Sequence, residues 1–141
     1  MGSSGVCVEP NKELSEKIKK NRPRDNVLNV AISDKIEILP YFSFKDDALN
    51  TFSEEESRRN VSHGNKFLRT YPVRAVTLNN VFDKLPRTPD LVSLDIEWYD
   101  EKALRVFDFS KYKPIVWCIE TIKKNDEEWS KNTSLIKLVE E

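Results

Sequence analysis

Asp90-Leu91-Val92-Ser93-Leu94-Asp95-Ile96-Glu97 is the stretch that decides which fold class this sequence predicts. Apolar residues interrupted only by a small serine are typical of a strand buried on both faces, the pattern of a central parallel strand. The run ends at two carboxylates, Asp95 and Glu97, and ligands of open α/β sheets bind beyond the carboxyl ends of the strands. For this strand alone, a simpler alternative is that Asp95 caps a turn and Glu97 is solvated.

Two further predicted strands end in an acid in the same way. Residues 5–8 lead into Glu9, and residues 114–119 lead into Glu120. Because three predicted strands end in carboxylates, a shared ligand site at one edge of a sheet is favoured. The alternative, in which each acid belongs to an unrelated turn, is less favoured.

Strand and helix patterns alternate along the rest of the chain. Further strands are expected at residues 27–32 and 73–76, and an irregular segment at 60–70. Residues 36–44 are expected to form an edge strand or a strand pair, because Pro40 cannot donate to a ladder. Helices are expected at 12–20 after Asn11, from Ser53 to residue 59, and at 77–85, 100–107 and 126–141. This alternation predicts an α/β fold with a mostly parallel sheet flanked by helices.

Composition narrows the classes of function. The 141 residues fit one domain, taken as residues 5–141, with residues 1–4 as a tag or disordered start. A net charge of −1 gives no overall basic field for nucleic acid. No apolar run is long enough to span a membrane, no signal peptide precedes the first strand, and Cys7 and Cys118 lie in apolar runs. We therefore expect a cytoplasmic protein with buried, reduced thiols.

Glu9 has a specific chemical use at the end of its strand. A carboxylate there can accept hydrogen bonds from both hydroxyls of a ribose, and residues 31–33 at the end of the next strand would flank the base. Binders of nicotinamide cofactors and of S-adenosylmethionine both use such an acid. An acid that only begins a helix, at its positive end, is the alternative without function.

Five runs carry a family resemblance. They are, in chain order, Gly5-Val6-Cys7-Val8-Glu9-Pro10-Asn11, Asn29-Val30-Ala31-Ile32-Ser33-Asp34, Val76-Thr77-Leu78-Asn79-Asn80-Val81-Phe82, Leu94-Asp95-Ile96-Glu97 and Ile119-Glu120-Thr121. Together they resemble the FkbM-type family of S-adenosylmethionine-dependent methyltransferases. The resemblance implies a Rossmann-like class I methyltransferase sheet and methyl transfer to a hydroxyl oxygen, often on a sugar or natural product.

The resemblance also implies roles for single residues. Glu9, with Pro10 beside it, would hold the ribose hydroxyls of S-adenosylmethionine, and Ala31, Ile32 and Ser33 would line the adenine. Asp95 would lie by the methionine end of the cofactor or by the acceptor. Glu97 and Glu120 would border the acceptor pocket, where a carboxylate takes the proton from the attacking hydroxyl. The expected partner is a small molecule or a glycan, and no metal is implied.

The sequence departs from the family pattern in two ways. Trp98 stands where the family usually has glycine after Asp-x-Glu. The family's first strand and its Gly-rich turn, which would precede Gly5, are absent, and the chain stops at Glu141 before the family's final strands. The resemblance therefore implies a partial domain. We expect such a chain to bind S-adenosylmethionine weakly or not at all alone, and its exposed strand edges to favour self-association.

Three other functions remain open from the residues. A non-catalytic remnant or interaction module would keep the sheet and lack the chemistry. A nicotinamide-dependent enzyme would also use Glu9, but no Gly-rich fingerprint precedes that acid. A metal-dependent hydrolase would have to use Asp95, Glu97 and Glu120 in a chain with a single histidine.

Overall fold

The computed structural model describes residues 4–96, 99–120, 122–125, 128–131 and 133–134. In chain order the elements are β1 (Val6–Val8), α1 (Lys12–Asn21), β2 (Asn26–Leu28), β3 (Ala31–Ile32), β4 (Glu37–Phe44), the 3-10 helix η1 (Asp47–Leu49), α2 (Glu54–Ser62), β5 (Phe67–Val76), α3 (Leu78–Phe82), β6 (Leu91–Leu94), α4 (Asp100–Arg105), β7 (Val116–Ile119), β8 (Ile122–Asn125) and β9 (Glu128–Lys131).

The described strands form four small sheets. β1 pairs with β2 and β6 pairs with β7, both in parallel, and β3, β5 and β4 form a third sheet in that order. β3 is parallel to β5, whereas β4–β5 and β8–β9 are antiparallel. The connection of the β4–β5 hairpin contains η1 and α2. The chain is therefore a mixed α/β structure, as predicted, with short parallel sheets in place of one wide sheet; a Rossmann-like sheet remains a prediction.

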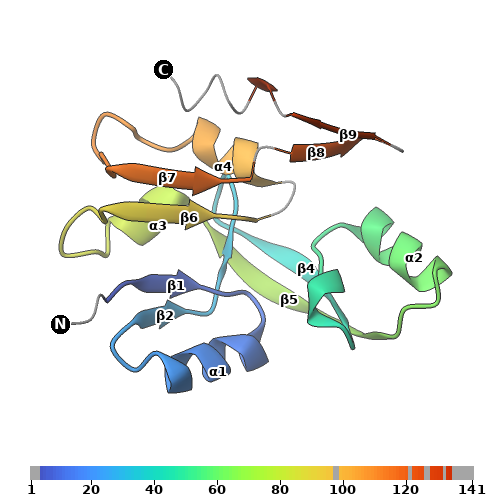
Figure 1. Cartoon of the computed structure of the whole chain (residues 1–141). Helices are drawn as coiled ribbons and strands as arrows, with labels where there is room; N and C mark the ends of the chain where they lie inside the picture. Colours follow the sequence, from blue (N-terminus) through green and yellow to red (C-terminus); the bar gives the residue numbers. More distant parts are fainter. Residues whose placement is uncertain (1–3, 97–98, 121, 126–127, 132, 135–141) are drawn as a thin grey trace.

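Four parallel strands follow one another across the molecule. Figure 1 shows them in the order β2, β1, β6, β7, with their arrows pointing to the same side. β1 and β6 are neighbours in this row, but among the described strands β1 pairs with β2 alone and β6 with β7 alone. The carboxyl ends of all four strands thus lie toward the same side of the molecule, where the β4–β5 hairpin begins.

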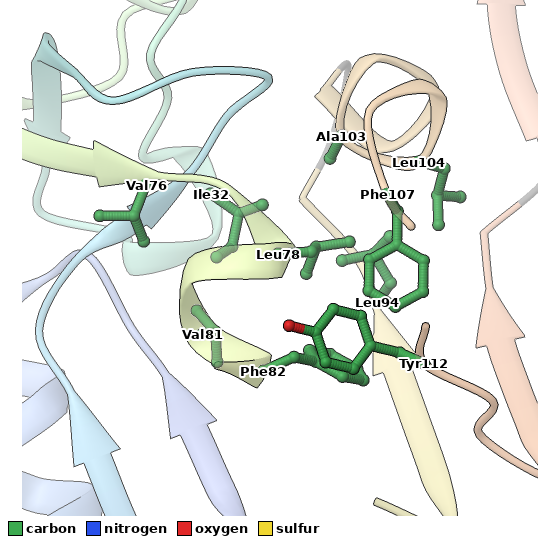
Figure 2. Close-up of a cluster of buried hydrophobic side chains, with 10 residues drawn as sticks. All are labelled: Ile32, Val76, Leu78, Val81, Phe82, Leu94, Ala103, Leu104, Phe107 and Tyr112. Atoms are coloured by element: carbon green, nitrogen blue, oxygen red, sulfur yellow. The ribbon is translucent and has the colours of Figure 1, made fainter. Parts of the chain in front are cut away.

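The larger core lies behind these strands and is built around α3 and α4. Leu78, Val81 and Phe82 of α3 are buried, as the helical spacing predicts, together with Leu104 of α4. Figure 2 shows Leu78 and Phe82 on the side of α3 that faces Leu94, Phe107 and Tyr112. The rings of Phe82 and Phe107 meet edge to face, with 4.9 Å between centroids, an arrangement that stabilises aromatic pairs.

Local helix signals are confirmed. The Asn11 side chain accepts hydrogen bonds from the backbone N–H groups of Glu13 and Leu14, so α1 begins where the sequence predicts. Ser53 caps α2 through a bond from Glu56 N–H at 3.2 Å. β4 is an edge strand, as Pro40 predicts, and Pro40 lies opposite Pro72 of β5.

The single strand predicted at residues 27–32 is wrong, because the structure divides it into β2 and β3. Asn29 lies at the division, and its side-chain amide donates to the carbonyl oxygens of Glu9 and Pro10 at 2.8 and 2.9 Å. The chain therefore leaves the ladder with β1 after Leu28, and β3 pairs with β5 instead.

The irregular segment predicted at residues 60–70 is also wrong. α2 continues to Ser62, Gly64 has a φ of 82° just after it, and β5 already begins at Phe67. The turn residues Gly64 and Asn65 occupy only the short connection. Phe67, Thr70 and Tyr71 are good strand formers, and they pair with the eight-residue strand β4.

Burial of β6 on both faces, expected of a central strand, is contradicted. Leu94 is buried, but Leu91 is 60% exposed, and its register partner Val116 on β7 is 47% exposed. One face of the β6–β7 sheet packs on the core, and no described residue covers the other. Cys118, on the uncovered face, is exposed rather than buried.

The amphipathic helix predicted at residues 126–141 is wrong at Glu128–Lys131, which forms β9. The sequence has a single apolar residue, Trp129, between Asp126 and Ser134, which is too few to define a helical face. Residues 126–127, 132 and 135–141 lie outside the described residues. Among the helices that are described, none has the length and apolar character needed to cross a bilayer.

Candidate functional site

Glu9 directly follows β1, and its half-buried side chain folds back onto the start of α1. Its Oε1 accepts a hydrogen bond from the backbone N–H of Asn11 at 2.7 Å. Burial raises the pKa of Glu9, the bond from Asn11 acts in the opposite direction, and the nearby carboxylate of Asp47 raises the pKa further. Glu9 is thus a carboxylate held in place at a strand end with part of its surface open to solvent.

The β4–β5 hairpin lies alongside Glu9. Burial raises the pKa values of Tyr41 and Tyr71, and the charge of Glu9 contributes to both increases. The two tyrosine rings are 5.2 Å apart, and the guanidinium of Arg69 lies 5.2 Å from the centre of the Tyr71 ring. Arg69 also bonds to Glu13 of α1 at 3.1 Å, which ties β5 to that helix. The hairpin therefore forms an aromatic wall beside the acid.

A second group of acids lies at the carboxyl ends of β6 and β7. Asp95 follows β6 and Glu120 follows β7, and both side chains are exposed. Asp100, in the first turn of α4, is only 4% exposed, and its Oδ1 accepts a hydrogen bond from Ile96 N–H at 3.2 Å. Burial, together with the charges of Asp95 and Glu120, raises the pKa of Asp100 to about 6. The hydrogen bonds that the Asp100 carboxylate accepts from the backbone N–H groups of Ile96 and Asp100 lower this pKa.

The predicted site residues thus fall into separate groups. Asp95 and Glu120 act electrostatically on one carboxyl, that of Asp100, whereas the carboxylate that acts on Glu9 is Asp47. Glu97 lies outside the described residues, as does Trp98. The structure therefore brings two of the predicted acids together and places Glu9 at the end of a neighbouring strand in the same row (Figure 1).

The residues predicted to line the adenine are buried. Ala31 is 2% exposed and packs with Tyr41 and Ala75, whereas Ile32 belongs to the larger core. The Ser33 hydroxyl donates to Glu37 at 2.7 Å, so it already has a partner inside the protein. Their role toward a cofactor remains a prediction. Pro10 is half-buried, and its carbonyl oxygen accepts from Asn29.

Asp100 and Tyr41 are among the residues of these groups that were not predicted as site residues. Asp100 was expected only to begin a helix, and its position at the start of the helix that follows the Asp95 strand end is the signal that identifies it. Tyr41 carries no such signal, because it reaches Glu9 only through the folding of the hairpin.

Other features of the described residues do not add to the site. A surface hollow of about 470 Å³ lies between η1 and the end of α2 and is lined by residues such as Lys45, Gly64 and Lys66. None of the predicted site residues lines it. In the part of the chain that the structure describes, no group of histidine, cysteine and acidic side chains has the arrangement of a metal site.

The fold is that of an α/β protein, and the acids at the carboxyl ends of its parallel strands, one of them half-buried beside an aromatic hairpin, form its candidate ligand site. Comparison with known protein families shows which family of α/β proteins the chain belongs to. The family model described as the methyltransferase FkbM domain matches residues 1–141, and the chain belongs to this family. Neither the curated proteins nor the solved structures contain a significant match. Membership implies methyltransferase activity.

Proposed function

We propose that this protein is an S-adenosylmethionine-dependent O-methyltransferase that acts on a hydroxyl of a sugar or another small metabolite in the cytoplasm. Family membership supports the methyltransferase class. The observation that carries the cofactor assignment is the half-buried carboxylate of Glu9, fixed by Asn11 N–H at the end of a parallel strand. A held carboxylate can accept hydrogen bonds from two neighbouring ribose hydroxyls.

The family resemblance supplies the roles that we propose for the cofactor contacts. Glu9 would hold the ribose with Pro10 beside it, and Ala31, Ile32 and Ser33 would form a buried floor under the adenine. Asp95 would face the methionine end, where its negative charge complements the positive sulfonium and ammonium groups. When bound, S-adenosylmethionine supplies a methyl group on a positively charged sulfur.

The acids at the ends of β6 and β7 would serve the acceptor. Asp95, Glu97 and Glu120 would border the acceptor pocket, and one of them would take the proton that the hydroxyl loses as its oxygen bonds to the methyl carbon. Asp100, with a pKa of about 6, is mostly ionised at neutral pH and adds to the negative potential there. Most of the rate would come from positioning, because the acceptor oxygen must lie in line with the carbon–sulfur bond.

A methyl-transfer assay tests this function. The full chain is incubated with millimolar S-adenosylmethionine carrying a labelled methyl group, and with a panel of sugars and small alcohols. We expect slow, measurable label transfer to a hydroxyl acceptor, at least tenfold slower at a fixed cofactor concentration in Glu9→Gln. The matched control is Glu55→Gln on α2, whose exposed side chain lies away from the acids; it should match the unaltered chain. Equal rates for Glu9→Gln, or transfer only to nitrogen or sulfur, would contradict the proposal.

A non-catalytic module of the same fold is the second candidate. The observation that favours it is the division of the parallel strands into two sheets, because a site that spans both sheets is not held rigidly by one ladder. This candidate predicts a folded chain that neither binds nor consumes S-adenosylmethionine.

A further inference from the structure

One face of the β4–β5 hairpin is exposed and largely apolar, and we call it the outer face. Residues directly opposite each other on paired strands point to the same side of a sheet. The register places three such pairs on the outer face, namely Ile38 with Arg74, Pro40 with Pro72, and Phe42 with Thr70. Ile38 is 64% exposed. The alternate residues point to the other side, where Tyr41 and Val73 are buried in the smaller core.

An apolar hollow lies at one end of the outer face, where α2 packs. Figure 1 shows α2 at the end of the hairpin that lies away from the parallel strands. The hollow, about 300 Å³, is lined by Phe42 and Phe67 of the hairpin, by Val61 of α2 and by polar residues that include Glu54. Val61 and Phe67 are both exposed. The outer face therefore has an apolar projection, Ile38, at one end and an apolar hollow at the other.

Charged side chains also differ between the two ends of the outer face. Arg74, opposite Ile38, is exposed, and within the described part of the chain it makes no ion pair. At the other end, the first turn of α2 holds three acids, whereas the whole helix holds two arginines. Glu54, which lines the hollow, bonds to Arg58 at 2.6 Å, and both side chains remain exposed. The Ile38 end is thus positive, and the α2 end has more acids than bases.

The outer edge of β4 is poorly suited to pairing with another strand. Phe42 N–H donates to Thr51 O at 2.9 Å, and Thr51 N–H donates to Phe42 O at 3.1 Å. Backbone groups alternate in direction along a strand, so Pro40 faces the same edge as Phe42, and it has no N–H to donate. An association of this hairpin would therefore use its outer face rather than its edge.

We propose that the outer face binds a second copy of this chain in a symmetric dimer, with the two-fold axis passing at Pro40 and Pro72, the middle pair of the face. A two-fold axis there exchanges the two ends of the face. Ile38 of one copy would lie over the hollow of the other, and Arg74 would meet Glu54 of the other copy. Each of these contacts occurs twice, as in an isologous interface. The proposal does not depend on the methyltransferase function.

The order of these features identifies the partner. It must present an apolar hollow and acids to Ile38 and Arg74, and an apolar projection and a base to the α2 end. A second copy, turned about the two-fold axis, presents all of them. An anionic lipid surface does not, because the acids of α2 would be repelled by it.

Sedimentation equilibrium of the full chain, over a range of micromolar concentrations, tests the proposal. We expect a concentration-dependent dimer that is at least tenfold weaker in Ile38→Glu. The matched control is Ile115→Glu, because Ile115 is 79% exposed and precedes β7, outside the hairpin. It should dimerise like the unaltered chain. A monomer at every concentration, or equal weakening by the two substitutions, would overturn the proposal.

A charge exchange keeps the proposal testable if Ile38→Glu perturbs the hairpin. Arg74→Glu and Glu54→Arg each place like charges across the interface, so each variant alone should dimerise several-fold more weakly than the unaltered chain. In an equimolar mixture, one chain of each kind places opposite charges at both contacts. We expect the mixture to contain more dimer than either variant alone. A mixture that contains no more dimer than the variants alone would overturn the two-fold arrangement.

NMR on mixed dimers locates the contact directly. Chains with labelled methyl groups are mixed with unlabelled chains, and nuclear Overhauser effects between the two kinds of chain are recorded. We expect the Ile38 methyl groups to contact the Phe42 or Phe67 ring of the other copy. Intermolecular contacts confined to Leu91 and Val116 would place the interface on the β6–β7 sheet and overturn the proposal.

Discussion

The buried carboxylate of Asp100 accepts a hydrogen bond from the backbone N–H of Ile96 at 3.2 Å. This bond joins the first turn of α4 to the segment that leaves β6, immediately after Asp95. It fixes the strand end from which the proposed acceptor-side acid projects. The charges of Asp95 and Glu120 also act on Asp100 and, together with burial, raise its pKa to about 6.

Asp100 should make stability decrease as the pH rises from about 4 to about 6. Its pKa is raised to about 6 in the folded chain from an ordinary value of 3.8, so the folded state holds the proton more tightly than the unfolded state. The stabilisation is complete below pH 4 and lost above pH 6. After allowance for solvent screening, we expect the loss to be about 1–2 kcal/mol.

Urea unfolding of the unaltered chain and of Asp100→Asn at pH 4, 5, 6, 7 and 8 measures this effect. Asparagine can still accept from Ile96 N–H, so the difference between the two curves isolates the titration. We expect Asp100→Asn to be the more stable protein at pH 7. Curves that stay parallel across the range would refute the assignment.

Ser15→Ala should stabilise the protein. The Ser15 side chain on α1 is fully buried, and its Oγ has no hydrogen-bond partner in the described part of the chain. An unsatisfied buried hydroxyl is costly, and alanine is the better helix former, so we expect a gain of about 1 kcal/mol. Thermal unfolding measures it. In the control Ser62→Ala, at the exposed end of α2, the change should stay within about 0.5 kcal/mol. A destabilised Ser15→Ala would show that the hydroxyl is satisfied.

Leu104→Ala and Leu91→Ala form a matched pair. Leu104 is fully buried in the core around α3 and α4, and its truncation should cost about 2–5 kcal/mol of unfolding free energy. Leu91 is 60% exposed on the uncovered face of β6, and its truncation should cost no more than about 0.5 kcal/mol. Denaturant unfolding of both variants measures the difference. Similar costs would mean that the exposed face of β6 is covered in solution.

Asn11→Ala should destabilise α1. The Asn11 side chain accepts from two N–H groups at the helix start, and loss of such a cap costs about 1 kcal/mol. Asn11→Asp keeps the capping oxygen and should retain most of the stability. Circular dichroism during urea unfolding follows both variants. If Asn11→Asp is as unstable as Asn11→Ala, the cap is not the source of the effect.

The elements that could be predicted from the sequence are those whose signals are local. The caps at Asn11 and Ser53 and the apolar face of α3 depend on residues within one or two turns, and all three are confirmed. The pairing of strands depends on distant residues. The division at Asn29 arises from bonds to Glu9 and Pro10, about 20 residues earlier, which no local pattern reveals.

In the candidate site, too, the features that depend on local sequence could be predicted, and those that depend on tertiary packing could not. Glu9, Asp95 and Glu120 follow their strands directly, so the positions at the strand ends could be predicted. The burial of Asp100 and the approach of Tyr41 to Glu9 follow from tertiary packing. The exposure of Leu91 could not be predicted either, because the apolar pattern of a strand does not say whether a neighbouring element covers each face.

Thermal unfolding of the full chain with increasing S-adenosylmethionine tests the central claim most directly. A ligand that binds only the folded state stabilises it by about 1.4 kcal/mol at ten times the dissociation constant. We predict a cooperative transition whose midpoint rises with cofactor concentration, and a clearly smaller rise for Glu9→Gln. A cooperative transition whose midpoint stays constant up to millimolar cofactor would contradict the claim and favour the non-catalytic module.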